Sequence, residues 1–271
     1  MHDSAPLISI VTPVLNRVRF IGDSIRSLAA QEYPNVEHIV MDGGSTDGTL
    51  DVLRQYEDRL RWESIPGLAQ APAINRALAM SQGEIIGILN SDDLYLPGAL
   101  RRAAEIFAAR PNLDAFYGTC LLIDVDGRTI GTHSTKAFNV NRLIWWEPGY
   151  FTIQAMFFRR RVFDLIGGWD TSLPLTTDYD WFIRVGKKCQ VEYVPECLGA
   201  FRRHEDATQG RRHREACFHE VVRTSRRHGG YWFTPIKYQF MERVPAATTV
   251  TRWLVPVKRV LVRAGLAPAW L

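Results

Sequence analysis

The chain has 271 residues, of which 46% are hydrophobic and 23% charged, a composition that excludes disordered, fibrous and collagen-like proteins. No stretch approaches the ~18 uninterrupted apolar residues of a membrane-spanning helix, and the start MHDSAPLISIV lacks the basic region of a signal peptide. The four cysteines form no CxxC pair and no zinc-like spacing, which favours reduced thiols. We therefore expect a globular, cytoplasmic protein with one sizeable core or two small ones.

The net charge of +4 conceals an asymmetry along the chain. Residues 202–271 carry 14 Lys and Arg against 5 Asp and Glu, whereas residues 1–201 carry 19 against 24. This shift predicts a main domain over about residues 1–210, followed by a basic helical extension over residues 211–271.

Strand-like and helix-like patterns alternate in the first 110 residues. Short β-rich runs predict strands over residues 7–15, 36–42, 61–65 and 84–89. Apolar residues at helical spacing predict helices over residues 16–30, 50–60, 72–80 and 97–109, with Pro97 in a first turn. This rhythm is typical of an α/β fold with a Rossmann-like, mostly parallel sheet that helices flank on both faces.

The pattern changes from residue 114 onward. AFYGTCLLIDVDGRTIGTHS predicts a hairpin around an Asp-Gly turn, and RRVFDLIGG predicts a helix. Asp124 and Asp126 have the spacing of an Asp-x-Asp metal motif, but their place at the hairpin tip indicates turn chemistry instead.

Polar residues follow three of the predicted strands. Thr12, Pro13 and Asn16 follow the first, Asp42 and the loop GGSTDG follow the second, and Asn90-Ser91-Asp92-Asp93 follows the strand at 84–89. Ligands bind beyond the carboxyl ends of such strands, so we expect these residues to share one crevice.

Asp92 and Asp93 are adjacent carboxylates at the end of a buried strand. Placing like charges side by side there costs free energy unless a cation lies between them. Mg²⁺ or Mn²⁺ takes one or two carboxylates together with ligand phosphates, so a metal that bridges a diphosphate fits this site. The alternative interpretation is that one Asp caps the helix at 97–109.

Three other places allow two interpretations. Asp178, in TTDYDWFIR, either caps the helix that follows or acts as a general base. His204 is either a surface histidine or a further metal ligand. Trp145 and Trp146 are either core residues or a platform on which an acceptor stacks.

Taken together, six segments within residues 7–208 resemble glycosyltransferase family 2, whose members are inverting enzymes with the GT-A fold. In order, they are ISIVTPVLN, VMDGGSTDGT, AINRALAMSQGEIIGILNSDD, IQAMFFRRRVFDLIGGWD, TTDYDWFIR and FRRHEDATQ. The resemblance implies a GT-A domain over residues 1–210, with a nucleotide-binding half at about 1–110 and an acceptor-binding half at 111–210.

The resemblance also implies roles for individual residues. The nucleotide would contact Thr12, Pro13, Asn16, Asp42, Asn75 and Asp92. The metal, Mn²⁺ or Mg²⁺, would be held by Asp93 and His204. The catalytic base would be Asp178. The acceptor would contact Trp145, Trp146 and Gln154.

The chain departs from the family pattern in two places. Family members often carry Asp-x-Gly and then Asp-Ala-x-Asn before the GEII-type strand, where this chain reads GLA at 67–69 and PAIN at 72–75. Thr177 stands in place of the Glu that often precedes the position of Asp178. Two acidic residues of the family pattern are thus absent from the donor region, and we expect a UDP-sugar only as the default donor.

We therefore expect metal-assisted transfer of a sugar, by a single inverting displacement, to a glycan, lipid-linked or polysaccharide-precursor acceptor. One alternative is a sugar-1-phosphate nucleotidyltransferase, although TPVLNRVRF matches its Gly-rich, Arg/Lys-containing signature poorly. Another is a catalytically lapsed family member that binds a nucleotide or a partner, which the retained Asp93 and Asp178 argue against. We expect no nucleic-acid partner, because the basic extension lacks a recognisable reading motif.

The C-terminal extension allows two interpretations. TRWLVPVKRVLVRAGLAPAW mixes apolar residues with Lys258, Arg259 and Arg263 in a pattern suited to lying on an anionic membrane. Such a peripheral contact on the inner face of the membrane would suit a lipid-linked acceptor. The alternative is a helix that packs its apolar side on the enzyme domain.

Overall fold

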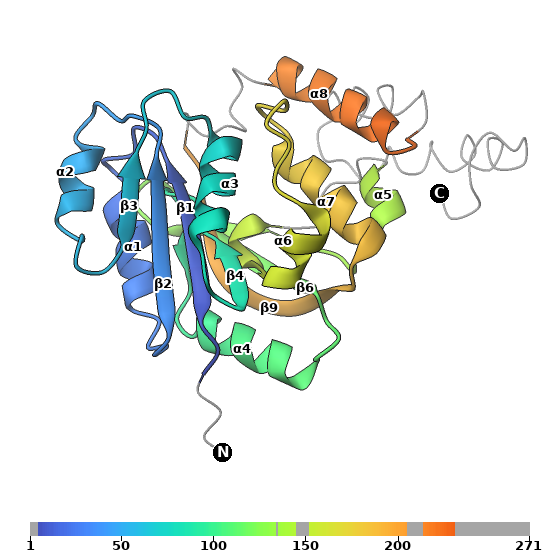
Figure 1. The fold of residues 1–271 in the computed structure, drawn as a ribbon, viewed down its shortest axis with the longest axis horizontal. Helices are drawn as coiled ribbons and strands as arrows, with labels where there is room; N and C mark the ends of the chain where they lie inside the picture. The colour runs from blue at the N-terminus through green and yellow to red at the C-terminus, as the bar shows by residue number, and fades with distance from the viewer. Residues whose placement is uncertain (1–4, 134, 145–151, 205–213, 231–271) are drawn as a thin grey trace, which may run out of the picture.

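The first half of the chain forms the parallel half of a single sheet. A computed structural model describes residues 5–133, 135–144, 152–204 and 214–230. In it, β1 (Ile8–Val14) pairs in parallel with β2 (Val36–Asp42) on one side and with β4 (Ile85–Ile88) on the other. Next to β2, β3 (Arg61–Ser64) adds a further parallel strand. The carboxyl ends of β1, β2 and β4 therefore lie at one edge of the sheet (Figure 1).

The second half of the chain extends this sheet with longer strands. β8 (Met156–Arg159) pairs antiparallel with both β4 and β6 (Ala115–Ile123), and β6 pairs in parallel with β9 (Val191–Arg202). The order of the nine-stranded sheet is β3-β2-β1-β4-β8-β6-β9-β5, where β5 (Leu94–Tyr95) is at the end and β7 (Thr129–His133) pairs with β6. The pairing of β9 brings residues near 202 beside the end of β4.

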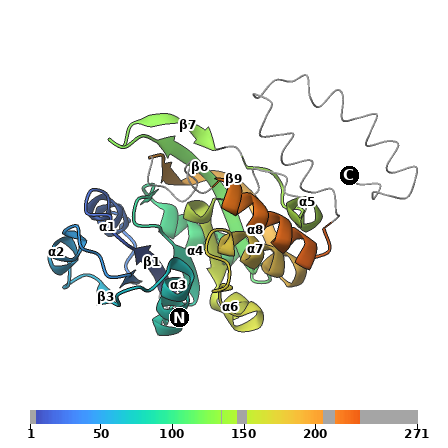
Figure 2. The ribbon, with the colours of Figure 1, turned by 90° about the horizontal axis from the view of Figure 1, so that it is seen from above.

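Helices cover both faces of the sheet (Figures 1 and 2). One face packs on α3 (Gln70–Met80), α6 (Arg160–Ile166) and α7 (Thr177–Lys188), and the other packs on α1 (Ile21–Ala29) and α4 (Ala99–Ala109). Strand β1 contributes side chains to both faces of the sheet. Val11 packs in the hydrophobic cluster that contains α3, α6 and α7, whereas Ile8 and Ile10 pack in the cluster that contains α1 and α4. The remaining helices are α2 (Thr49–Arg54), α5 (Val140–Ile144), α8 (Arg214–Arg227) and the short 3₁₀ helix η1 (Ile153–Ala155).

The alternation of strands and helices matches the sequence prediction, and the boundaries differ for local reasons. Helix α1 begins at Ile21 rather than residue 16, because Asn16 adopts a left-handed φ of 52° and the Arg17 carbonyl closes a turn onto the N–H of Phe20. Helix α4 begins at Ala99, after Gly98 at φ 80°, so Pro97 precedes the helix instead of opening it.

The hairpin of β6 and β7 confirms the interpretation of Asp124 and Asp126 as turn residues. The Asp124 carboxylate accepts the N–H groups of Asp126 and Arg128, both at 2.9 Å, and Gly127 has a φ of 83°. All four cysteines are free, as expected. Across the part of the chain that the structure describes, no helix is long and apolar enough to cross a membrane.

Candidate functional site

Asp92 and His204 meet at the shared edge of β1, β2 and β4. The Nε2 atom of His204 lies 2.8 Å from Oδ2 of Asp92, and the Nε atom of Arg17 lies 3.5 Å from the same oxygen. The side chain of Asp92 is 16% exposed and that of His204 is 5% exposed. Strand β9 makes this pair possible, since it carries residue 204 to the strand end across 112 positions of sequence. Two predicted site residues are thus brought together.

A cavity of about 370 Å³ opens beside this pair. Its lining comes from the turn after β1, from the loop after β2, from the hairpin tip and from the end of β9. The lining residues are Asn16, Arg17, Val18, Arg19, Phe20, Asp47, Val125 and His204. Asn16 is the predicted nucleotide-binding residue in this set, and its amide oxygen accepts the Thr46 N–H at 2.9 Å. Two arginines in the wall make the cavity suited to an anion.

Asp93 points into the protein rather than toward the cavity. It is 1% exposed, and its Oδ2 atom accepts hydrogen bonds from Gln154 at 2.5 Å and from Asn90 at 3.1 Å. Its Oδ1 atom accepts the Arg202 N–H at 2.9 Å. Burial, with the neighbouring charge of Asp92 second, raises the pKa of Asp93 to about 8. Both oxygens of Asp93, the predicted metal ligand, thus accept hydrogen bonds from protein groups in the structure.

Arg202 is a further site residue that the sequence analysis did not single out. Its side chain is 1% exposed, and its Nε atom donates to the Asp92 carbonyl at 2.9 Å. Its guanidinium also contacts Asp23 at 3.1 Å and lies 5.0 Å from the centre of the Phe20 ring. Arg202 therefore holds the main chain at Asp92, in the segment that follows β4. The segment FRRHEDATQ marked this region, but nothing in it distinguishes Arg202 from Arg203.

Four predicted binding residues have structural partners instead of an open surface. Thr12 is completely buried, and its hydroxyl lies 2.9 Å from Nε2 of His38, whose pKa burial lowers to about 4. The adjacent Pro13 is buried in the same strand. Both amide ends of Asn75 bond the main chain of Trp169, at 2.9 and 2.7 Å. The contacts of Thr12, Pro13 and Asn75 with the nucleotide, and of Gln154 with the acceptor, stay predictions, and in the structure Gln154 is buried against Asp93.

Asp42 organises the loop GGSTDG. One of its oxygens accepts the N–H groups of Gly44 at 2.8 Å and Ser45 at 2.9 Å, and the Ser64 hydroxyl at 2.6 Å. The other oxygen accepts the hydroxyl of Ser45, and the carboxylate is completely buried. Protein donors therefore surround the Asp42 carboxylate in the structure, and its hydrogen bond to the nucleotide base stays a prediction.

Asp178 lies in the first turn of α7, and its Oδ1 atom accepts a hydrogen bond from the N–H of Tyr179 at 2.7 Å. Burial raises its pKa, and the charge of Glu220 adds to this. Among the described residues we find no ion pair to Asp178.

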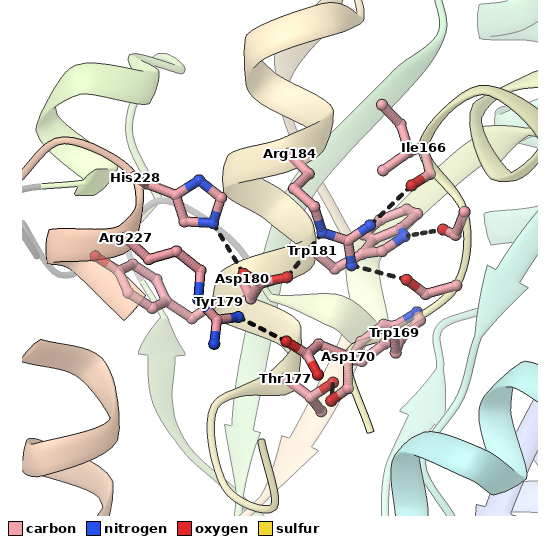
Figure 3. Close-up of polar contacts among 12 residues, drawn as sticks. Ile166, Trp169, Asp170, Thr177, Tyr179, Asp180, Trp181, Arg184, Arg227 and His228 are labelled. Carbon is pink, nitrogen blue, oxygen red and sulfur yellow. Dashed lines mark hydrogen bonds and ion pairs between the residues drawn. The ribbon is translucent and has the colours of Figure 1, made fainter. Parts of the chain in front are cut away.

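Asp180 differs, because it bonds Arg184 at 2.7 Å and His228 at 2.8 Å (Figure 3). Burial alone would raise the pKa of Asp180, but these two partners outweigh it and lower the pKa.

The remaining predictions concern the acceptor and the metal. Trp145 and Trp146 lie outside the described residues. The residues that the structure describes contain no cluster of three or more His, Cys, Asp or Glu side chains that could hold a metal. Asp92 and His204 form a pair of such side chains, 2.8 Å apart.

The chain is similar to known proteins in sequence and in fold. The family model for glycosyl transferase family 2 matches residues 9–169. A PGL/p-HBAD biosynthesis glycosyltransferase of Mycobacterium bovis is 26% identical over 273 residues, which are 96% of this chain and 95% of that protein. The putative teichuronic acid biosynthesis glycosyltransferase TuaG of Bacillus subtilis is 35% identical over 126 residues, 45% of this chain and 50% of that protein. An uncharacterized glycosyltransferase of Rickettsia felis is 28% identical over 224 residues; the match covers 78% of this chain but 37% of the relative.

Solved structures have the same fold. S. aureus TarS 1–349, in complex with UDP-GlcNAc, superposes with a TM-score of 0.67 at 20% identity over 82% of this chain and 66% of that chain. The mannosyltransferase PcManGT from Pyrobaculum calidifontis, in complex with GDP-Man and Mn²⁺, gives a TM-score of 0.64 at 19% identity over 96% and 81% of the two chains. The expected GT-A fold is confirmed. Since the family model also matches more than half of the chain, the protein belongs to glycosyltransferase family 2.

Proposed function

We propose that this glycosyltransferase transfers a sugar from a nucleotide-sugar donor, with a divalent cation and with inversion, to an acceptor in cell-envelope glycan synthesis. The observation that carries the proposal is the Asp92–His204 pair beside an arginine-lined cavity at the strand ends. The donors bound in the two similar solved structures, UDP-GlcNAc and GDP-Man, support a nucleotide sugar. The names of the mycobacterial and Bacillus relatives support a glycolipid or cell-wall polysaccharide acceptor.

We assign the cation to Asp92 and His204 instead of Asp93. The carboxylate and imidazole atoms are 2.8 Å apart, the side chain of Asp92 is 16% exposed, and His204 lines the cavity. The other ring nitrogen of His204 is buried with no hydrogen-bond partner in the described part of the chain, so the ring is held mainly through its Nε2 side. When bound, Mn²⁺ or Mg²⁺ would stabilise the negative charge that develops on the diphosphate leaving group.

The protein's own groups account for the remaining requirements of the reaction. Arg17 is 22% exposed in the cavity wall and lies beside Asp92, where its guanidinium can bond a phosphate oxygen. Asp178 would accept the proton of the acceptor hydroxyl as that oxygen attacks the anomeric carbon. Because one base and one displacement suffice, the anomeric configuration inverts.

Isothermal titration calorimetry with UDP, GDP and dTDP, with and without Mn²⁺, tests this proposal. We expect one nucleotide to bind only with Mn²⁺. Asp92→Ala should weaken that binding by at least about tenfold, as loss of a metal ligand does. Asp164→Ala, which removes an exposed carboxylate from α6 and no residue that lines the cavity, serves as the matched control and should bind like the parent protein.

Two outcomes would contradict the proposal. Equal nucleotide binding with and without Mn²⁺, unaffected by Asp92→Ala, would remove the metal from the site. No binding of any of the three nucleotides would favour the alternative of a lapsed family member that binds a partner.

A further inference from the structure

Helix α8 lies beyond the residues that the family model matches, yet it contacts the segment that enters α7 (Figures 1 and 2). Arg227 bonds Asp170 at 2.7 Å, and His228, directly after the helix, bonds Asp180 at 2.8 Å (Figure 3). The Ser225 hydroxyl donates to the Ile144 carbonyl at 2.6 Å. Helix α8 is therefore fastened to α7, to the loop before it and to α5.

Glu220 makes the contact nearest to the start of α7. Its Oε2 atom accepts the N–H of Leu175 at 2.8 Å, the N–H of Thr176 at 2.7 Å and the hydroxyl of Thr176 at 2.9 Å. The residue is 7% exposed, so these bonds are shielded from water. A negative charge at the start of a helix is also favoured by the helix dipole.

This arrangement substitutes for an ordinary helix cap. Thr176 occupies the N-cap position, but its side chain makes no capping hydrogen bond to α7 because its hydroxyl donates to Glu220. Two residues later, Asp178 extends from the first turn of α7. The position and direction of Asp178 therefore depend on a backbone segment that a different helix holds.

We propose that Glu220, which reaches from α8 to the residues before α7, is a positioning residue for Asp178. The proposal rests on the role of Asp178 as the base, which is part of the proposed function. Three hydrogen bonds to one carboxylate oxygen fix the residues before α7, and thereby fix the carboxylate that must meet the acceptor hydroxyl. Displacing a reacting group by about 1 Å can cost about 100-fold in rate.

The test compares Glu220→Ala, Glu220→Gln and Arg227→Ala in the full chain. Gln keeps an oxygen that can accept the N–H groups of Leu175 and Thr176, whereas Ala removes it. Arg227→Ala is the matched control, since it breaks another contact of the same helix with the same loop. Circular dichroism melting checks folding, and Glu220→Asp, whose side chain is shorter, takes the place of the Ala variant if that variant fails to fold.

Two readouts separate positioning from general stability. The first is amide hydrogen exchange over residues 173–180. The second is hydrolysis of UDP-GlcNAc or GDP-Man with Mn²⁺. We expect Glu220→Ala to accelerate exchange there and to lower kcat by roughly 10- to 100-fold, with the donor KM within about twofold of the parent value. Glu220→Gln should restore most of the slow amide exchange and most of the kcat, and Arg227→Ala should retain the parent kcat.

Unchanged exchange in folded Glu220→Ala would overturn the proposal without any activity measurement. A parent-like kcat in Glu220→Ala would overturn it as well, and so would an equal loss of kcat in Arg227→Ala, because general docking of α8 would then explain the effect. Asp178→Asn distinguishes the two levels. If Asp178→Asn stays active, the base assignment in the proposed function fails. If only Asp178→Asn is inactive, the role of Glu220 alone fails.

Discussion

At the scale of single residues, Asp92 and Asp93 are neighbours with opposite environments. Asp93 accepts three hydrogen bonds in the core, and Asp92 faces His204 and Arg17 at the cavity. Asp93→Ala leaves buried donors unpaired, so we expect it to lower the free energy of unfolding by about 2 kcal/mol. Asp92→Ala should lower it by less than about 1 kcal/mol. Urea denaturation of the two variants measures the difference, and the reverse order would show that the two environments are exchanged.

The role of Asp178 predicts a pH dependence. A general base works only when it is deprotonated, and burial raises the pKa of Asp178 above its ordinary value of 3.8. Transfer should therefore fall as the pH drops through the raised pKa, at a pH above 3.8, and the titration of Asp178 should no longer change the rate at higher pH. Asp178→Asn should lower kcat by about 100-fold or more and remove that acidic limb.

Asp164→Asn provides the control for this pH experiment. Asp164 lies exposed on α6, so its amide variant should keep both the kcat and the acidic limb of the parent protein. An acidic limb that persists in residual Asp178→Asn activity would assign the titration to another group.

At the scale of elements, α3 is joined to the loop before α7 through Asn75. The side-chain amide of Asn75 bonds both the N–H and the carbonyl of Trp169. Gly168 approaches the same amide so closely that a Cβ atom added to Gly168 would lie 2.4 Å from the Asn75 amide oxygen. Asn75→Ala would leave two main-chain groups unpaired. We expect it to lower the free energy of unfolding by about 2 kcal/mol and to leave nucleotide affinity unchanged.

Gln70→Ala is the control for that loss, because Gln70 is an exposed amide on the same helix. It should change the free energy of unfolding by no more than about 0.5 kcal/mol. If the Asn75→Ala variant is stable but binds the nucleotide more weakly in calorimetry, that result would support the prediction that Asn75 contacts the nucleotide.

The elements also show what the sequence could predict and what it could not. The strands and helices up to residue 109 follow from local apolar periodicity, and the strand-end location of the site follows from their parallel order. Local periodicity does not predict which of Asp92 and Asp93 is buried. That depends on Gln154 and Arg202, which bond Asp93 from positions 61 and 109 residues further along the chain. Asp42 and Asn75 matched family positions, but their partners at Ser64 and Trp169 depend on loop packing that periodicity does not encode.

At the scale of the whole molecule, positive charge is concentrated at the C-terminal end. Residues 202–271 carry 14 Lys and Arg against 5 Asp and Glu, and residues 231–271 lie outside the described part. If a lipid-linked acceptor is used, this basic segment would bring the enzyme to the membrane surface, where each basic residue near an anionic leaflet contributes about 1 kcal/mol. We therefore expect binding to vesicles that contain phosphatidylglycerol in low salt, and release as NaCl screens the charges.

A charge-matched pair of triple variants decides whether this binding is local. Replacing Lys258, Arg259 and Arg263 by Gln should weaken vesicle binding by roughly 100-fold, from the loss of about three such contributions. The control replaces three exposed arginines of the enzyme domain by Gln and removes the same net charge, at Arg54, Arg59 and Arg128. If both variants weaken vesicle co-sedimentation equally, net charge is responsible and the C-terminal segment has no special part. If the parent protein does not sediment with vesicles in low salt, the segment packs on the enzyme domain or serves another purpose, and the acceptor must reach the cavity without it.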